Sequence, residues 1–302
     1  MSLRWRKLGL AVHPAKGGPD PFGSHAMVPF RREGELCYSV RDAQGRSHTV
    51  AARWHPEAAP IPAEEGRPLL APGPLGAFDD AGAMGSCAVA ADDGSEHLYY
   101  IGWSLGVSVP FVTSIGCARS TDGGRTFERA SAAPVIGRNR FDPFLATSPW
   151  VIRDGGRWRM WYTSATRWES TPAGPKHHYN IRHAESDDGI EWRVDGTVCV
   201  NFASADEYAL ARPCVVRDRD TYRMWFSRRG EAYRIGYAES SDGIAWERRD
   251  AEAGIDVSAD GFDAESQEYP HVFHDGHDWR LLYNGADYGR TGIGHAVAEG
   301  AA

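Results

Sequence analysis

Residues 211–226, ARPCVVRDRDTYRMWF, decide the fold because the same pattern occurs at two other places in the chain. Residues 148–162 (SPWVIRDGGRWRMWY) and 268–283 (EYPHVFHDGHDWRLLY) also start with a short apolar run beside a proline, turn at an aspartate and continue with alternating polar and aromatic residues. Alternation with a period of two, bounded by turn residues, is typical of a β-hairpin. The chain is therefore predicted to repeat one antiparallel unit.

A third strand and a tight turn follow two of these hairpins, and an earlier segment has the same pattern. The segments are residues 115–127 (IGCARSTDGGRTF), 181–192 (IRHAESDDGIEW) and 235–246 (IGYAESSDGIAW). The aspartate of each turn is expected to accept hydrogen bonds from N–H groups two residues further on, and the next glycine to take a positive φ. The turns contain Asp122–Gly123, Asp188–Gly189 and Asp242–Gly243, with Phe127, Trp192 and Trp246 packed beneath them. We interpret them as folding devices.

A self-similar unit of roughly 40–60 residues with four strands is typical of a β-propeller blade. We predict an all-β fold, a single five-bladed propeller domain spanning residues 1–302 with four-stranded antiparallel blades. The blades are expected at about residues 25–54, 80–129, 148–193, 212–248 and 268–298. The last unit is one strand short. Residues 3–9 are expected to supply that strand and to close the ring, which leaves no unpaired edge.

Two segments do not follow the repeated pattern of strands and turns. Residues 56–74 are rich in proline and are expected to connect the first blade to the second across the ring. Residues 167–179 contain two prolines, a glycine and the pair His177-His178, and are expected to form a long loop inside the third blade. Long loops on a rigid scaffold often carry function.

The composition sets limits on partners and location. The chain has 302 residues, 42% of them hydrophobic, and a formal net charge of -8, which suits a globular protein and disfavours nucleic acid or an anionic membrane as partner. Apolar runs stay far below the ~18 residues of a membrane span. Five scattered cysteines without CxxC spacing favour a reduced cytoplasm. The sequence does not fix the oligomeric state.

No cofactor or metal is expected. The sequence contains no HExxH, P-loop, GxGxxG or GxSxG motif. His271, His274 and His277 are spaced by three, which on a strand alternates between the two faces and cannot present three ligands together.

The turns resemble the Asp-box of propeller enzymes that act on glycans, most closely at residues 120–127 (STDGGRTF). Over nearly the whole chain, the spacing of the repeated strands is similar to that in the five-bladed propeller superfamily of glycoside hydrolase and phosphorylase families 43, 32, 68 and 130. More narrowly, residues 24–26 (SHA), 41–47 (RDAQGRS), 78–82 (FDDAG) and 100–103 (YIGW) resemble glycosidase-like bacterial proteins associated with surface-polysaccharide and sugar-modification genes. The resemblance implies a saccharide substrate and three carboxylates, from different blades, at the central channel.

Cleavage of a glycosidic bond needs one protonated and one ionised carboxyl group. Glu268, in residues 268–270 (EYP), is the predicted acid because this segment resembles the Glu-Gly-Pro segment of family 43. Asp80, Asp142 or His25 is the predicted base; His25 stands where family 43 has its first-blade aspartate, so a standard triad does not transfer intact. The predicted substrate-binding residues are Arg41, Asp79, Trp103, Arg140, Glu207, Arg212, Arg228 and Glu265.

Other interpretations stay open for these residues and for the whole protein. Each carboxylate could instead cap a turn or pair with an arginine, and His25 could be a channel histidine satisfied by a backbone carbonyl. A cluster of arginines would suit a phosphorylase, in which phosphate replaces water as nucleophile. A non-hydrolytic enzyme of sugar or metabolite modification and a catalytically silent glycan-binding propeller also remain.

Overall fold

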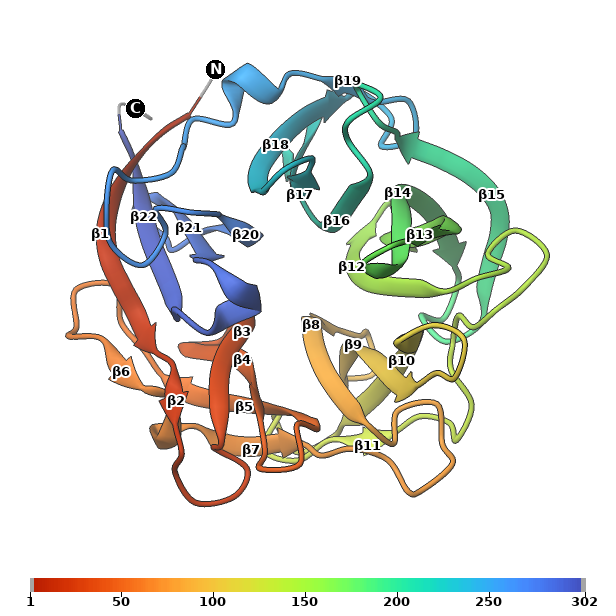
Figure 1. Ribbon diagram of the computed structural model, residues 1–302, viewed down its shortest axis with the longest axis horizontal. Coiled ribbons are helices and arrows are strands. Elements are labelled where there is room, and N and C mark those ends of the chain that lie inside the picture. The colour runs from red at the N-terminus through yellow and green to blue at the C-terminus, as the bar shows by residue number, and fades with distance from the viewer. Residues whose placement is uncertain (1–2, 300–302) are drawn as a thin grey trace.

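The computed structural model describes residues 3–299, which are built almost entirely from β-strands (Figure 1). Successive groups of antiparallel strands lie around a central axis, in chain order from red to blue. The prediction of an all-β, propeller-like fold is confirmed. No helix among these residues is long and apolar enough to cross a membrane.

Each group consists of strands that follow one another along the chain and pair in that order. The first is β2 (Ala15–Lys16), β3 (Ser24–Arg32), β4 (Glu35–Arg41), β5 (Ser47–Arg53) and β7 (Arg67–Leu70). The second is β8 (Gly82–Ala90), β9 (Glu96–Leu105), β10 (Phe111–Ser120) and β11 (Glu128–Arg129). The third is β12 (Ala146–Asp154), β13 (Arg157–Thr171), β14 (Gly174–Ser186) and β15 (Trp192–Val200).

The C-terminal half continues the pattern. The next group is β16 (Ala209–Asp218), β17 (Thr221–Arg229), β18 (Tyr233–Ser240) and β19 (Glu247–Arg248). The last is β20 (Glu268–His274), β21 (Trp279–Asn284) and β22 (Ile293–Glu299), and β22 pairs antiparallel with β1 (Arg4–His13). Three 3₁₀ turns complete the structure: η1 (Ala63–Glu65), η2 (Asp250–Glu252) and η3 (Asp287–Gly289). The strand expected at residues 3–9 is therefore present and extends further, to His13.

The innermost strand of four of these groups carries a bulge next to a proline. The register shifts there in β3, β12, β16 and β20, and one residue in each shift has a positive φ. These residues are Val28 (54°), Ser148 (47°), Arg212 (54°) and Tyr269 (55°), each followed by proline. A bulge adds one residue to a strand and turns its side chain in a new direction. The innermost strands can therefore direct successive side chains toward the axis.

The Asp-box turns fold as predicted and also join neighbouring groups. The Asp188 carboxylate accepts hydrogen bonds from the N–H groups of Ile190 (2.8 Å) and Glu191 (2.9 Å), and Gly189 has a φ of 78°. The carbonyl of Gly189 accepts a hydrogen bond from the Tyr99 hydroxyl on β9 (2.7 Å).

The other two turns repeat this scheme with small differences. The carbonyl of Gly243 accepts a hydrogen bond from Trp161 Nε1 on β13 (2.8 Å). In the remaining turn the Asp122 carboxylate accepts from the N–H groups of Arg125 and Thr126, three and four residues on, instead of two. Here Arg32 Nη2, at the end of β3, donates to the Gly123 carbonyl (3.2 Å). Each of the three turns thus folds through its own aspartate and also binds a side chain of the preceding group.

Two predictions about connections are corrected. Residues 167–179 are not a loop: β13 and β14 pair from Arg167–His178 out to Thr171–Gly174, so the hairpin is longer than expected. Trp168 near its tip packs against Phe111 at the start of β10 (5.5 Å between ring centroids), which joins the hairpin to the preceding group. Residues 56–74 were expected only to connect the first group to the second, but they also contain two short strands. Of these, β6 (Ile61–Pro62) pairs parallel with β1, and β7 pairs with β5.

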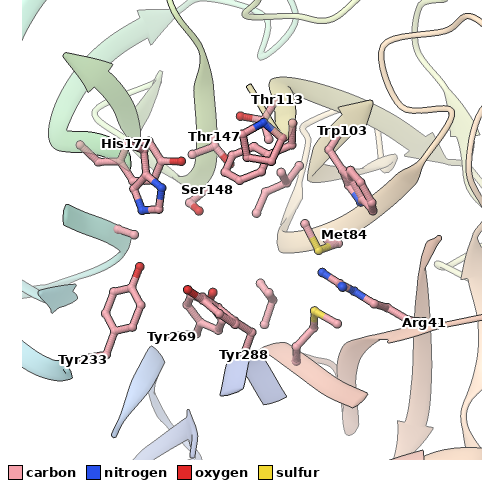
Figure 2. Close-up of a pocket in the computed structure, with 17 residues that line it drawn as sticks. Arg41, Met84, Trp103, Thr113, Thr147, Ser148, His177, Tyr233, Tyr269 and Tyr288 are labelled. Carbon is pink, nitrogen blue, oxygen red and sulfur yellow. The ribbon is translucent and has the colours of Figure 1, made fainter. Parts of the chain in front are cut away.

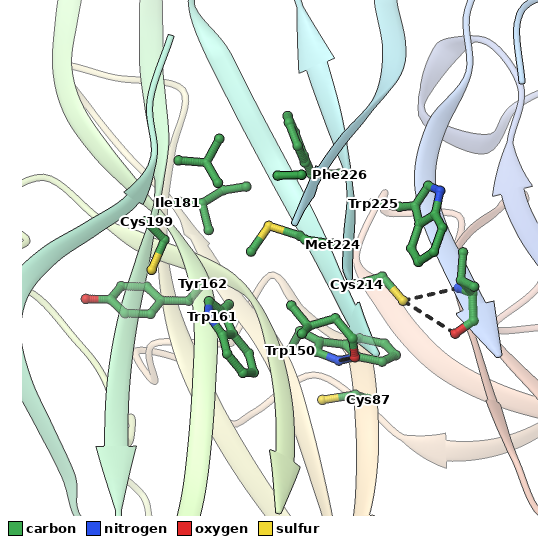
Figure 3. Packing of buried hydrophobic residues seen from close by; sticks show 14 of the residues in the cluster. Cys87, Trp150, Trp161, Tyr162, Ile181, Cys199, Cys214, Met224, Trp225 and Phe226 are labelled. Carbon is green, nitrogen blue, oxygen red and sulfur yellow. Dashed lines mark hydrogen bonds between the residues drawn. The ribbon is translucent and has the colours of Figure 1, made fainter. Parts of the chain in front are cut away.

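Large apolar side chains fill the space between neighbouring groups. Trp150, Trp161 and Met224 belong to one buried cluster that lies between β12–β13 and β16–β17 (Figure 3). The thiol of Cys214 accepts a hydrogen bond from the N–H of Val272 (3.1 Å), which links β16 to β20. All five cysteines are buried and free.

Candidate functional site

An axial cavity of about 440 Å³ lies where the innermost strands approach one another (Figure 2). The innermost strands β3, β8, β12, β16 and β20 all contribute to its lining, through Met27 and Val28, Met84, Thr147 and Ser148, Ala211, and Tyr269. Three of these residues, Val28, Ser148 and Tyr269, are the positive-φ residues of the bulges. The repeated bulge therefore helps to build the cavity, because it places a side chain of each of these three strands at the axis.

Aromatic side chains from the outer parts of the hairpins form the walls. They are Trp103, Phe111, His177, Tyr179, Tyr233 and Tyr288. His177 stacks on Tyr179 with ring centroids 4.2 Å apart and planes 13° from parallel. Burial lowers the pKa of His177 to about 4, so its ring is neutral at physiological pH. Such walls suit the apolar face of a sugar ring.

Arg41 and Trp103 were predicted to bind substrate, and both line the cavity. The Arg41 guanidinium lies 5.8 Å from the centroid of the Trp103 ring, and Trp103 Nε1 donates to the Ser47 hydroxyl (3.3 Å). Figure 2 shows the Arg41 side chain reaching toward the open space. Its Nε is buried and has no hydrogen-bond partner within residues 3–299. Burial lowers the pKa of Arg41, and the neighbouring Arg290 lowers it further.

Three tyrosines form the opposite side of the cavity. Tyr233, Tyr269 and Tyr288 come from β18, β20 and η3. The Tyr288 hydroxyl accepts a hydrogen bond from Arg229 Nη1 (2.7 Å), and the Arg229 guanidinium also lies 4.9 Å from the Tyr233 ring centroid. Burial raises the pKa values of Tyr233 and Tyr269 well above the usual range, so both hydroxyls stay protonated and act as neutral hydrogen-bonding groups.

Glu268, the predicted acid, is buried beside these tyrosines. It is only 3% exposed, and its Oε1 accepts a hydrogen bond from the Ser266 hydroxyl (3.2 Å). Its Oε2 is buried and finds no partner in the described part of the chain. Burial raises the pKa of Glu268 to about 7 and the charge of Asp287 adds to the rise, against the effects of Ser266, the Tyr288 N–H and Arg229. Much of Glu268 is therefore protonated at neutral pH.

Asp142, a predicted base, has no free oxygen. Its carboxylate is completely buried and accepts hydrogen bonds from the Ser164 hydroxyl (2.6 Å), the Tyr162 hydroxyl (3.0 Å) and Asn139 Nδ2 (2.9 Å). Arg182 Nη1 lies 3.3 Å away as an ion-pair partner. Asp142 does not line the axial cavity. The geometry supports a structural role for it.

The same arrangement recurs at two other places. Asp79 Oδ2 accepts from the Tyr100 hydroxyl (3.0 Å) and from Arg129 Nε (2.8 Å). Asp263 Oδ2 accepts from the Tyr283 hydroxyl (3.1 Å). A buried aspartate thus anchors the tyrosine of the second strand in three groups, which explains why acidic residues precede these groups in the sequence.

The other predicted polar residues also lie outside the cavity lining. Asp80 accepts the Gly76 N–H and holds a turn (2.9 Å). Glu207 pairs with Arg248 (2.6 Å), and Arg228 with Asp250 (3.6 Å). Arg140 is exposed on the face of Phe141, and Glu265 is exposed, with its backbone carbonyl accepting a hydrogen bond from Arg234.

Arg212 and His25 lie close to the cavity without lining it. Arg212 is completely buried; its guanidinium donates to the Ser86 hydroxyl (2.9 Å), the Ser86 carbonyl (2.7 Å) and the Pro29 carbonyl (3.0 Å), and so ties β16 to β8 and β3. His25 Nδ1 lies 2.7 Å from the Ser24 hydroxyl. Burial, with the charges of Arg41 and Arg290, lowers the pKa of His25 to about 4, so it is neutral near pH 7.

Several lining residues were not predicted from the sequence. Tyr269 and Ser148 could have been found, because each precedes one of the repeated prolines. His177 was set aside because neighbouring His177 and His178 point apart on a strand; they do, and His177 faces the cavity while His178 hydrogen-bonds Glu169 (2.7 Å). Within residues 3–299, no group of three or more His, Cys, Asp or Glu side chains could hold a metal ion.

Solved structures identify the class to which this architecture belongs. A protein described as a glycoside hydrolase matches with a TM-score of 0.69 and 16% identity, covering 97% of this chain and 90% of that protein. An alpha-L-arabinofuranosidase from Lactobacillus brevis matches at 0.63 with 15% identity, covering 90% of each protein. A thermostable family-43 glycoside hydrolase matches at 0.63 with 14% identity, covering 91% of this chain and 88% of that protein. The chain has the fold of the propeller glycosidase superfamily.

Closer relatives exist among bacterial proteins. The chain is 43% identical over 307 residues to the Mycobacterium tuberculosis proteins MT1551 and Rv1502, both described as uncharacterized, covering 98% of this chain and 100% of theirs. It belongs to the same family as these two mycobacterial proteins. No family model matches the sequence.

Proposed function

We propose that this chain is a carbohydrate-active enzyme that binds a saccharide in the axial cavity and acts on a glycosidic bond with Glu268 as general acid. The observation that carries the proposal is the state of this carboxyl group: it is buried beside the cavity, its pKa is raised to about 7, and its Oε2 is unpartnered within residues 3–299. The shared fold supports it, because the structural neighbours include glycoside hydrolases.

The chemistry follows from that state. A glycosidic oxygen is a poor leaving group unless it receives a proton while its bond to the anomeric carbon breaks. An acid with a pKa near the working pH transfers this proton most effectively. Tyr233, Tyr269 and Tyr288 would hold the sugar against Glu268 through their hydroxyl groups and ring faces.

The second group that acid/base catalysis needs beside Glu268 has to come from outside the cavity lining. No acidic residue within 3–299 lines the axial cavity. The predicted bases Asp80 and Asp142 are engaged in hydrogen bonds. His25 is unprotonated near pH 7, but its lowered pKa of about 4 makes it a weak base, and it lies outside the lining. Asp287, exposed on η3, lies close enough to raise the pKa of Glu268 and of His25. We propose it as the ionised carboxylate.

A catalytically silent glycan-binding protein is the second candidate. The absence of a carboxylate from the cavity lining of the described residues favours it, because hydrolysis of a glycosidic bond needs an ionised group as well as an acid. A phosphorylase is the close catalytic variant. In it phosphate would be the nucleophile, and Arg41 in the cavity wall would bind the phosphate.

We also propose that the scaffold is a single five-bladed propeller over residues 1–302, closed by the N-terminal strand. The antiparallel pairing of β1 with β22, from Arg4–Glu299 to Val12–Ile293, supports closure. The contribution of β3, β8, β12, β16 and β20 to one cavity supports a single ring.

The test is the substitution Glu268→Gln with Glu265→Gln as matched control, since Glu265 lies three residues earlier and is exposed. Released sugar is measured with and without phosphate, and saccharide binding is measured by calorimetry. E268Q should lose roughly 10²- to 10⁴-fold in kcat while ligand affinity changes little, and E265Q should match the wild type. The wild-type rate should fall as pH rises through 7, because Glu268 then loses its proton.

Two results would separate the alternatives. Full turnover in E268Q would rule out Glu268 as the acid. Saccharide binding without any turnover in the wild type would favour the silent binding protein, and turnover only with phosphate would favour the phosphorylase.

A further inference from the structure

Arg41 is a cation without an anionic partner at the wall of the axial cavity. Its guanidinium faces the cavity and it has no ion-pair partner within residues 3–299. Burial is the main cause that lowers the pKa of Arg41, and Arg290, a second cation, lowers it further; the neighbouring Tyr269 hydroxyl stays neutral and does not balance the charge. Trp103, 5.8 Å away, offers a ring face that helps to fix the guanidinium without neutralising it.

Arg212 adds a second uncompensated charge next to the cavity. It follows Ala211, which lines the cavity, and it is completely buried. Its hydrogen bonds go to neutral oxygens of Ser86 and Pro29, and its Nε finds no partner in the described part of the chain. Because the surroundings have a low dielectric constant, its charge is screened much less than a surface charge would be.

The acidic groups nearby do not cancel these charges. Glu268, whose pKa is raised to about 7, is only partly ionised near neutral pH, and Asp287 is exposed to solvent on η3. Burying a charged group without a counterion is unfavourable, so an anion bound in the cavity would stabilise these arginines. A guanidinium offers two parallel N–H donors that match a carboxylate or a phosphate.

We infer that the saccharide bound in the axial cavity carries an anionic group, a carboxylate or a phosphate, which Arg41 binds while the aromatic walls hold the sugar ring. This inference rests on the proposed function, because it names the substrate class of the same cavity. The carboxylate would come from an acidic sugar and the phosphate from a sugar phosphate.

The test uses pairs of ligands in which one member carries an anionic group and the other a neutral group at the same position, titrated into the full chain by calorimetry. Glucuronate is compared with its neutral methyl ester, galacturonate with its methyl ester, and glucose 1-phosphate with methyl glucoside. The charged member of at least one pair should bind roughly 10- to 100-fold more tightly. The acidic-sugar pairs and the phosphate pair distinguish the two sources of the anion.

Variants then assign the preference to Arg41. Arg41→Met should abolish the preference, so that the charged and the neutral member of each pair bind the variant with similar affinity. Arg140→Met, at an exposed arginine outside the lining, should bind like the wild type. Arg41→Lys keeps the charge but loses the paired donors, and should weaken binding of the charged ligand roughly 10-fold.

Each contrary result has a definite meaning. Equal affinity for both members of every pair would overturn the inference and leave the proposed function standing. Binding of no ligand in the panel would also overturn the inference, whereas the proposed function is decided separately by the turnover of the wild type and of Glu268→Gln. A preference that survives in Arg41→Met would remove Arg41 from the anion site. If Arg41→Met does not fold, an unchanged affinity of Arg41→Lys for the charged ligand would overturn the inference.

Discussion

When the protein folds, the Glu268 carboxyl group loses its hydrogen bonds to water. In their place Oε1 accepts a hydrogen bond from the Ser266 hydroxyl, and Oε2 has no partner within residues 3–299. The neutral form tolerates this environment better than the charged form, and this is why the pKa is raised. The same burial that would make Glu268 an acid at neutral pH therefore makes it a source of instability once it ionises. Function and stability are coupled through one proton.

This coupling gives a prediction about stability and pH. The folded-state pKa of about 7 lies above the ordinary value of 4.5, so the favourable contribution of protonated Glu268 is complete below 4.5 and is lost as pH rises through 7. The glutamine introduced by Glu268→Gln cannot ionise, so the substitution removes this loss. The unfolding free energy of the variant minus that of the wild type should therefore increase by on the order of 3 kcal/mol from pH 5 to pH 9. Urea denaturation at both pH values measures this. Glu265→Gln is the control, and an E268Q difference that is the same at both pH values would contradict the prediction.

At the scale of a single element, the Asp-box turn combines local folding with contact between groups. Asp242 accepts hydrogen bonds from the N–H groups of Ile244 (2.8 Å) and Ala245 (2.9 Å) and from the Ser240 hydroxyl (2.9 Å). The turn so formed presents the Gly243 carbonyl to Trp161. Loss of the carboxylate would release the turn and weaken a contact on another hairpin.

Asp242→Ala should therefore destabilise the protein by about 1–3 kcal/mol, because it removes three hydrogen bonds and leaves polar groups without partners. Saccharide binding to the remaining folded protein should be unchanged, since the turn contributes nothing to the axial cavity lining. Chemical denaturation and calorimetry check the two parts. Asp220→Ala, at an exposed aspartate of another hairpin turn, should change stability by less than about 0.5 kcal/mol. Equal losses in both variants would show that the turn contacts are not responsible.

The elements could be predicted from the sequence where their signals are local. The hairpins and the glycines of positive φ follow from alternation and turn chemistry within a few residues, and both are confirmed. Residues 167–179 were wrongly expected to be a loop, because Pro172, Gly174 and Pro175 mark only the tip of a longer hairpin. A local signal of a turn does not show how far the strands on either side extend.

The site could be predicted only in part because it depends on where side chains point. Arg41 and Trp103 reach the cavity as expected. Asp79 and Asp142 precede inner strands as expected too, but their carboxylates turn toward the tyrosines of the following hairpins. The sequence places an acidic residue near a strand, whereas a partner about twenty residues away decides which way it faces.

At the scale of the whole molecule, the two ends of the chain meet in one sheet. Pairing of β1 with β22 runs along most of β22, and Figure 1 shows the two strands side by side. Trp5 on β1 also contacts the neighbouring group: its Nε1 donates to the Ala253 carbonyl (3.1 Å), and its ring packs edge-on against Trp225 at 6.1 Å. The N-terminal strand thus joins the last group of strands to the one before it.

If this junction closes a single ring, weakening it should destabilise the whole molecule at once. Trp5→Ala removes a buried indole and should lower the unfolding free energy by about 3–5 kcal/mol in one cooperative transition. Near-ultraviolet circular dichroism and tryptophan fluorescence should report the same midpoint, because each group depends on its neighbours. Arg6→Ala, an exposed position on the same strand, should leave the midpoint nearly unchanged. Two separate transitions, with only one shifted by Trp5→Ala, would contradict the single-domain ring and indicate that parts of the chain fold independently.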